Sequence, residues 1–158
     1  MGGAACIPLK IEWFMELSAD EALKKGVEAH QAGQTQKADR PYSFVLNAQP
    51  NHPDANHNMG VLVVGVNKIQ EALAYFKIAL EANSSIGQYR LSYINTLIKL
   101  AELDDAKVAL NQAKNIGAGG EAFDQIEQWL LEPSENSTKP RDSDPTSEEW
   151  QTIINLWT

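Results

Sequence analysis

The stretch GVLVVGVNKIQEALAYFKIAL, residues 60–80, decides the fold, because the chain carries it in three related forms. Residues 26–46 and 94–114 align with it without a gap, at the same offset of 34 on either side. The residues that coincide are small or apolar: Ala38, Ala72 and Ala106; Tyr42, Phe76 and Leu110; Val45, Ala79 and Ala113. This offset is the repeat period. A period of this length predicts helix pairs stacked in a solenoid, in which each pair buries its apolar side against its neighbours.

Small residues recur where the two helices of a pair would cross. Gly26 and Gly60 are one repeat period apart, and Ile94 takes this position in the third unit. Short side chains allow two helix axes to approach within about 8–10 Å. Pro53 should open a helix, because a first-turn residue does not need its N–H. Pro41 falls inside the second helix of the first unit and predicts a kink or a late helix start.

These residues resemble the tetratricopeptide repeat, TPR, whose pattern has a small residue early in the first helix, Gly at the turn, Ala early in the second helix, an aromatic residue, a second Ala followed by Leu, and a closing Pro. The middle unit matches best, with Gly60, Ala72, Phe76, Ala79 and Leu80 in place. The resemblance covers about residues 19–117. It implies an all-α fold, a right-handed α-solenoid of about three TPR helix pairs with a C-terminal capping helix.

The chain divides into four expected regions. Residues 1–18 form an N-terminal segment that can be helical, and residues 19–131 form the solenoid with its capping helix. Residues 132–145, EPSENSTKPRDSDP, are a polar linker with prolines. Residues 146–158 are predicted to form an amphipathic helix whose apolar stripe comprises Trp150, Ile153, Ile154 and Trp157. This helix also looks like the start of a further repeat, so we expect the chain to be part of a longer one.

Composition limits the classes of partner. The net charge of −8, without a run of Lys and Arg, argues against nucleic acid and against an anionic membrane surface. One cysteine, Cys6, builds neither an internal disulfide nor a cysteine-ligated zinc site. No apolar segment of about 18 residues is present to cross a membrane. We therefore expect a cytoplasmic protein.

The polar residues could belong either to a catalytic or metal-binding site or to the scaffold of the repeats. Walker A, G-x-S-x-G, H-E-x-x-H and G-x-G-x-x-G motifs do not occur. The polar stretch PDANHNMG, residues 53–60, follows His52 and contains His57, but residues five apart do not share a helix face. We expect no enzyme activity, no metal and no cofactor.

The TPR resemblance implies that the first helices of the pairs line a concave groove that binds a protein or peptide. The predicted lining is Leu23, Val27, His57, Asn58, Val61, Val64, Leu91, Asn95 and Ile98. In this interpretation the amides of Asn58 and Asn95 bond the ligand backbone, and the aliphatic residues supply apolar area. The alternative for some of these residues is packing between adjacent first helices. The clamp with which TPR domains bind chaperone tails is matched only at Asn58, since its other positions are Leu23, Val27, Gln88 and Ser92.

Two further interpretations remain open. The chain resembles the N-terminal targeting or assembly region of bacterial proteins in which TPRs precede a glycosyltransferase or sulfotransferase domain. Alternatively, the stripe of Trp150, Ile153, Ile154 and Trp157 in one chain occupies the groove or the open end of another and produces a homodimer.

Overall fold

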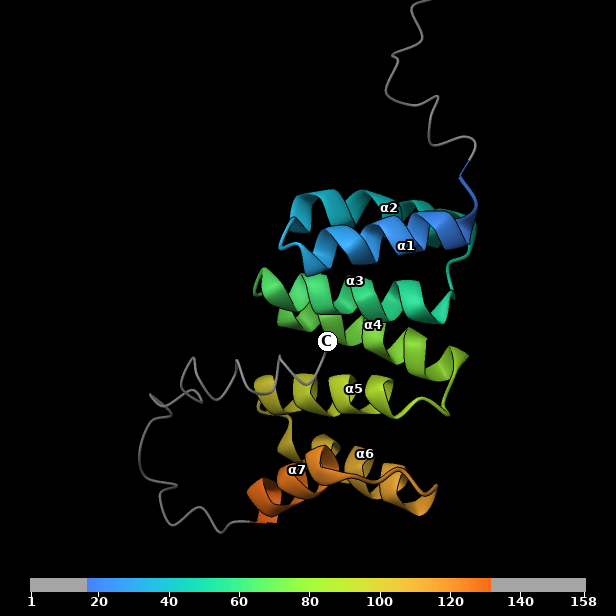
Figure 1. Cartoon of the computed structure of the whole chain (residues 1–158). Helices are drawn as coiled ribbons and strands as arrows, with labels where there is room; N and C mark the ends of the chain where they lie inside the picture. The colour runs from blue at the N-terminus through green and yellow to red at the C-terminus, as the bar shows by residue number, and fades with distance from the viewer. Residues whose placement is uncertain (1–16, 132–158) are drawn as a thin grey trace, which may run out of the picture. The chain divides into compact units, whose positions relative to one another are not determined.

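The computed structural model describes residues 17–131, and all regular secondary structure within that range is α-helical, as predicted. Figure 1 shows the helices in chain order. They are α1 (Ala19–Gln31), α2 (Thr35–Ala48), α3 (Pro53–Gly65), α4 (Ile69–Ala82), α5 (Gly87–Lys99), α6 (Leu103–Asn115) and α7 (Glu121–Leu131). The expected N-terminal segment, apart from Leu17 and Ser18, the linker and the Trp150/Trp157 helix lie outside the described residues.

The helices follow the repeat period. The first helices α1, α3 and α5 begin at Ala19, Pro53 and Gly87, and the second helices α2, α4 and α6 begin with the same spacing. Helix α7 begins at Glu121, one further period after the start of α5. The predicted capping helix thus starts where the repeat period places the first helix of a fourth unit.

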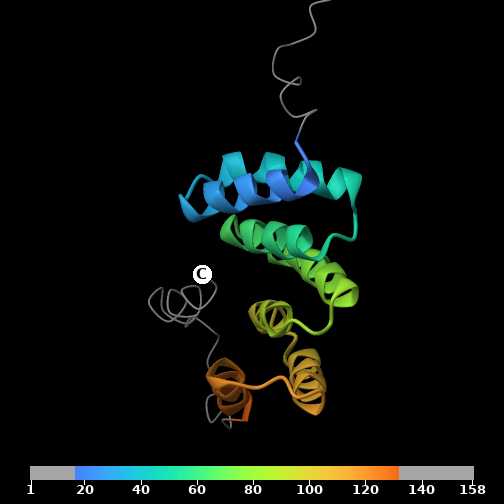
Figure 2. The ribbon, with the colours of Figure 1, turned by 45° about the vertical axis from the view of Figure 1, so that its right-hand side comes forward.

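The chain forms two compact units, Met1–Glu102 and Leu103–Thr158. In the described part of the first unit, α1 packs on α2, α3 packs on α4, and α2 and α4 contact the next first helix along the chain. Figures 1 and 2 show the α1–α2 and α3–α4 pairs as successive layers. In the described part of the second unit, α6 packs on α7, and Lys114 of α6 forms an ion pair with Glu127 of α7.

Glycines occur where the paired helices approach each other closely. A Cβ atom added to Gly60 would lie 2.6 Å from Cε1 of Phe76, and one added to Gly26 would collide with the ring of Tyr42. Both rings are fully buried. In the first two pairs, therefore, an aromatic ring of the second helix lies against a glycine of the first helix, which confirms the predicted crossing point.

The turn inside each pair has the same backbone form. Gly33, Asn67 and Ala101 recur at the repeat period, and all three have a positive φ, of 70°, 61° and 60°. After each of them, the next N–H bonds the carbonyl five residues earlier, as in Gln34 to Ala29 (2.9 Å), Lys68 to Val63 (3.1 Å) and Glu102 to Leu97 (2.9 Å). This is a Schellman motif, which ends one helix and orients the next.

Pro41 does not delay the start of its helix. Helix α2 begins at Thr35 and continues through the buried Pro41 to Ala48, and it is as long as α4, with 14 residues each. Of the two alternatives predicted for Pro41, the late start was therefore wrong, and the kink stays a prediction. The turn at Gly33 sets the start of α2, because Lys37 and Ala38 already bond the carbonyl of Gln34 before the chain reaches the proline.

Side chains also fix the connections between pairs. Pro53 is the first residue of α3, as predicted, and the His52 imidazole accepts the Ala55 N–H at 3.3 Å. The buried Asn56 amide donates to the carbonyl oxygens of Pro50 and His52, both at 2.9 Å. One period later, the Arg90 guanidinium donates to the carbonyl of Ser84 at 2.8 and 3.1 Å. The side chains at equivalent positions 56 and 90 thus bond the carbonyls of equivalent residues, Pro50 and Ser84, in the preceding connection.

Candidate functional site

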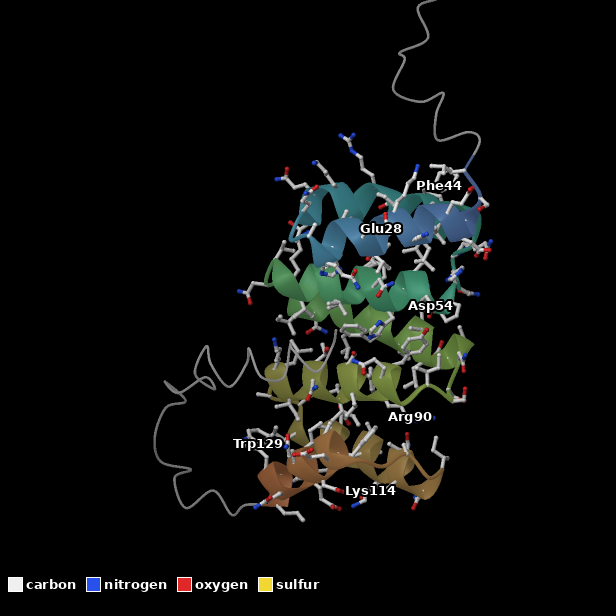
Figure 3. All side chains as sticks on the ribbon, viewed as in Figure 1. Glu28, Phe44, Asp54, Arg90, Lys114 and Trp129 are labelled. Atoms are coloured by element: carbon white, nitrogen blue, oxygen red, sulfur yellow. The ribbon has the colours of Figure 1, made fainter. Side chains whose placement is uncertain are left out.

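The candidate site lies on the first helices α1, α3 and α5, which belong to one compact unit. In Figure 3 these helices carry the labels Glu28, Asp54 and Arg90. Seven of the nine predicted lining residues are half-buried: Leu23, Val27, Asn58, Val61, Val64, Leu91 and Ile98. We call these seven side chains the A face. A half-buried side chain keeps area that a ligand can still cover.

Four of the six aliphatic members of the A face occupy equivalent positions of successive units. Val27 of α1 and Val61 of α3 are one repeat period apart, as are Val64 of α3 and Ile98 of α5. Leu23 is partly buried and packs against the core cluster of Ala22, Val45 and Ala55. Because the helices repeat their geometry, equivalent positions form rows, and apolar rows of this kind suit the apolar anchors of an extended peptide or an amphipathic helix.

The amides predicted for this face differ in their exposure. Asn58 is half-buried, whereas Asn95 is only 7% exposed. An Asn side chain offers both a donor and an acceptor, which is what a ligand backbone requires. Asn58 is therefore the better placed of the two for such a bond.

His57 is buried between three helices. Its side chain is 8% exposed, and its Nε2 lies 2.9 Å from the Ser92 hydroxyl of α5. Its ring centroid lies 4.9 Å from that of Tyr89 and 5.6 Å from that of Phe76. His57 therefore follows the alternative of packing between helices rather than lining the groove. Its contacts hold α3 to α4 and α5.

Burial keeps the His57 imidazole neutral. Desolvation lowers the pKa of His57 to about 4, although a hydrogen bond with Asn58 and the negative charge of Asp54 act in the opposite direction. A neutral imidazole can either donate to the Ser92 hydroxyl or accept from it. The rings of Phe76 and Tyr89 pack against the imidazole, so the group suits packing better than proton transfer.

A second polar contact, besides the one between His57 and Ser92, joins α3 and α5. The Tyr89 hydroxyl of α5 donates to Oδ1 of Asp54 in α3. Burial and this bond raise the pKa of Tyr89. Asp54–Tyr89 and His57–Ser92 both join residues 35 apart, one more than the repeat period. The sequence signal for these contacts between neighbouring first helices is a pair of polar residues at this spacing.

The polar stretch around residues 53–60 is thereby accounted for by structural contacts. His52 caps α3, Asp54 and His57 contact α5, and Asn56 holds the preceding turn. Between residues 17 and 131, no group of three His, Cys, Asp or Glu side chains is placed to hold a metal ion. Across the same range, no helix combines the length and the apolar character needed to span a bilayer.

Solved structures share this architecture. The first TPR of Spaghetti (RPAP3), bound to the HSP90 peptide SRMEEVD, is similar with a TM-score of 0.65 and 17% identity, over 71% of this chain and 89% of that chain. The TPR2B domain of yeast Sti1 in its pHsp70 complex has a TM-score of 0.63 and 19% identity, over 71% and 94%. The translocator chaperone SycD of Yersinia enterocolitica has a TM-score of 0.60 and 14% identity, over 82% and 89%.

At these identities the likeness speaks for the fold alone. No protein-family model matches the sequence, and no curated protein matches it. The similarities lend no support to the transferase alternative. The chain therefore has the all-α solenoid fold of TPR domains.

Proposed function

We propose that the chain is a non-catalytic interaction module that binds a peptide or a helix of a partner protein on the A face. The observation that carries the proposal is the set of half-buried aliphatic side chains on α1, α3 and α5, in which Val27 with Val61, and Val64 with Ile98, occupy equivalent positions of neighbouring first helices. Val61 of α3 and Leu91 of α5 belong to this set. A ligand would gain most of its binding energy by covering these residues, while Asn58 bonds a backbone group of the ligand.

The joint between α3 and α5 supports this role. The Asp54–Tyr89 and His57–Ser92 bonds set the spacing of the two helices before any ligand arrives. A surface that is already ordered loses less conformational entropy on binding. His57 is then a positioning residue, and Asn58, Val61 and Leu91 are the residues in contact with the ligand.

Proteins of the same fold make a peptide ligand reasonable. The RPAP3 domain is in a structure bound to an HSP90 peptide, and the Sti1 domain is in a complex with pHsp70. In this chain the positions of the chaperone clamp hold Leu23, Val27, Gln88 and Ser92. We infer that the ligand has apolar anchors rather than a carboxylate-rich tail, because these four residues bring no positive charge to meet carboxylates.

A selection from random peptides tests the proposal. Displayed dodecapeptides are selected on the full chain, and their affinities are then measured for Val61→Asp and Leu91→Asp. The control is Val66→Asp, because Val66 is 51% exposed and lies outside the A face. We expect peptides with apolar anchors, affinities about tenfold or more weaker for the two A-face variants, and no change for the control. Equal affinity for all three variants, each with an unchanged helical spectrum, would refute the assignment.

A further inference from the structure

Helix α7 carries more apolar surface than α6 covers. Phe123 is buried, Ile126 and Leu130 are half-buried, and Trp129 is 47% exposed. Ala122, Ile126 and Trp129 lie at i, i+4 and i+7, so they share one side of the helix. We call these three residues the α7 stripe. Figure 3 labels Trp129 on this helix.

Trp129 is unusual for its position in the repeat. The equivalent residues of the other first helices are Val27, Val61 and Asn95, all of them smaller than tryptophan. A half-exposed tryptophan leaves a large apolar area in water. The α7 stripe therefore has the character of a contact surface for another apolar element.

The chain itself supplies an element of matching pattern. The sequence continues after α7 from Glu132 to Thr158, and the only apolar stripe in that part of the sequence is that of Trp150, Ile153, Ile154 and Trp157. If helical, this segment places the four residues on one face, with Thr152 and Asn155 opposite.

The connection between the two elements has a suitable length. Residues 132–145 are the predicted polar linker, and a chain of about 14 residues would span about 20 Å on average if it behaved as a coil. Helix α7 has 11 residues and is about 16 Å long. The linker can thus return the segment along α7. A tether of this length gives an effective concentration of order 1 mM, which favours the same chain over a second copy.

We propose that residues 146–158 pack along α7 of the same chain, with Trp150 and Trp157 against the α7 stripe. The contact would cover Trp129 and complete the surface that α6 leaves open. This contact does not depend on the proposed ligand of the A face, and the two proposals are tested with variants of different residues.

Hydrogen exchange on the full-length chain tests this contact from the side of the segment. Replacing Trp150→Ala and Trp157→Ala together should accelerate exchange of the α7 amides by on the order of tenfold. The amides of α1–α4 serve as the internal reference and should not change. The matched control, Thr152→Ala with Asn155→Ala, removes the opposite side of the same segment and should leave α7 protected.

The reciprocal variant tests the contact from the side of α7. Trp129→Ser should accelerate exchange of the amides in residues 148–157 to a similar extent. Val108→Ser is the control, because Val108 is 53% exposed on α6 and is not in the α7 stripe. Protection that is indifferent to Trp150→Ala and Trp157→Ala would overturn the proposal. Protection of α7 that falls on dilution, together with a dimer mass by light scattering, would also overturn it, because the segment would then come from a second copy.

Discussion

At the scale of single residues, the three turns inside the helix pairs differ in how well their side chains suit the backbone. Gly33, Asn67 and Ala101 all adopt the left-handed region of φ. Glycine occupies this region at no cost and asparagine is tolerated there, whereas the Cβ of alanine costs about 1 kcal/mol. The third turn therefore holds strain that the first turn does not.

We predict that Ala101→Gly raises the free energy of unfolding by about 0.5–1 kcal/mol, since relief of the left-handed strain outweighs the added flexibility of the unfolded chain. Urea denaturation followed by circular dichroism measures the change. Asn67→Gly should give a smaller gain, and Gly33→Ala should destabilise. A decrease in stability for Ala101→Gly would contradict the assigned backbone.

At the scale of elements, two side-chain bonds and one buried ring join α3 to α5. Burial lowers the pKa of His57 in the folded protein to about 4, from an ordinary value near 6.5. Between these two values the unfolded chain binds a proton that the folded chain does not bind. The contribution of neutral His57 is therefore fully present above pH 6.5, and it is lost as the pH falls toward 4.

We predict that the wild type loses up to about 3 kcal/mol more stability between pH 7 and pH 4 than His57→Gln does. Glutamine can still bond Ser92 but does not titrate. Carboxylates titrate in both proteins, so the difference between the two pH profiles of urea unfolding isolates His57. Parallel profiles would show that His57 is protonated in the folded protein as easily as in water.

At the scale of the whole molecule, a shared fold does not carry a shared ligand. The RPAP3 domain has the same architecture and is in a structure bound to SRMEEVD. This chain has Leu23, Val27, Gln88 and Ser92 at clamp positions, and only Asn58 matches. Recognition depends on these side chains, which differ freely while the repeat pattern is kept.

We predict no measurable binding of the peptide SRMEEVD by isothermal titration calorimetry up to about 1 mM, because its carboxylates would lose water without gaining cationic partners. The first TPR of RPAP3 is the positive control. A micromolar dissociation constant for this chain would show that cations outside the clamp positions replace it, and would move the proposed ligand class toward acidic tails.

The extent of agreement between sequence and structure follows from the repeat. The helix pairs, the glycine contacts of Gly26 and Gly60, and the start of α3 at Pro53 were all predictable, because a fixed period and local helix preferences specify them. The late start at Pro41 was wrong, because the preceding turn controls where α2 begins. For the candidate site, the sequence indicated which residues lie on first helices.

The sequence by itself therefore determined the repeat and the helix order, because spacing along one chain encodes them, and the face on which a ligand is sought is implied by the resemblance to TPR domains. Only the tertiary structure decided that His57 is buried against Tyr89 and Ser92, that Asp54 accepts the Tyr89 hydroxyl, and that Asn56 and Arg90 hold equivalent turns. The physical reason is that these bonds depend on how neighbouring helices are spaced and which rotamers their side chains adopt. Neither property is a function of the period alone.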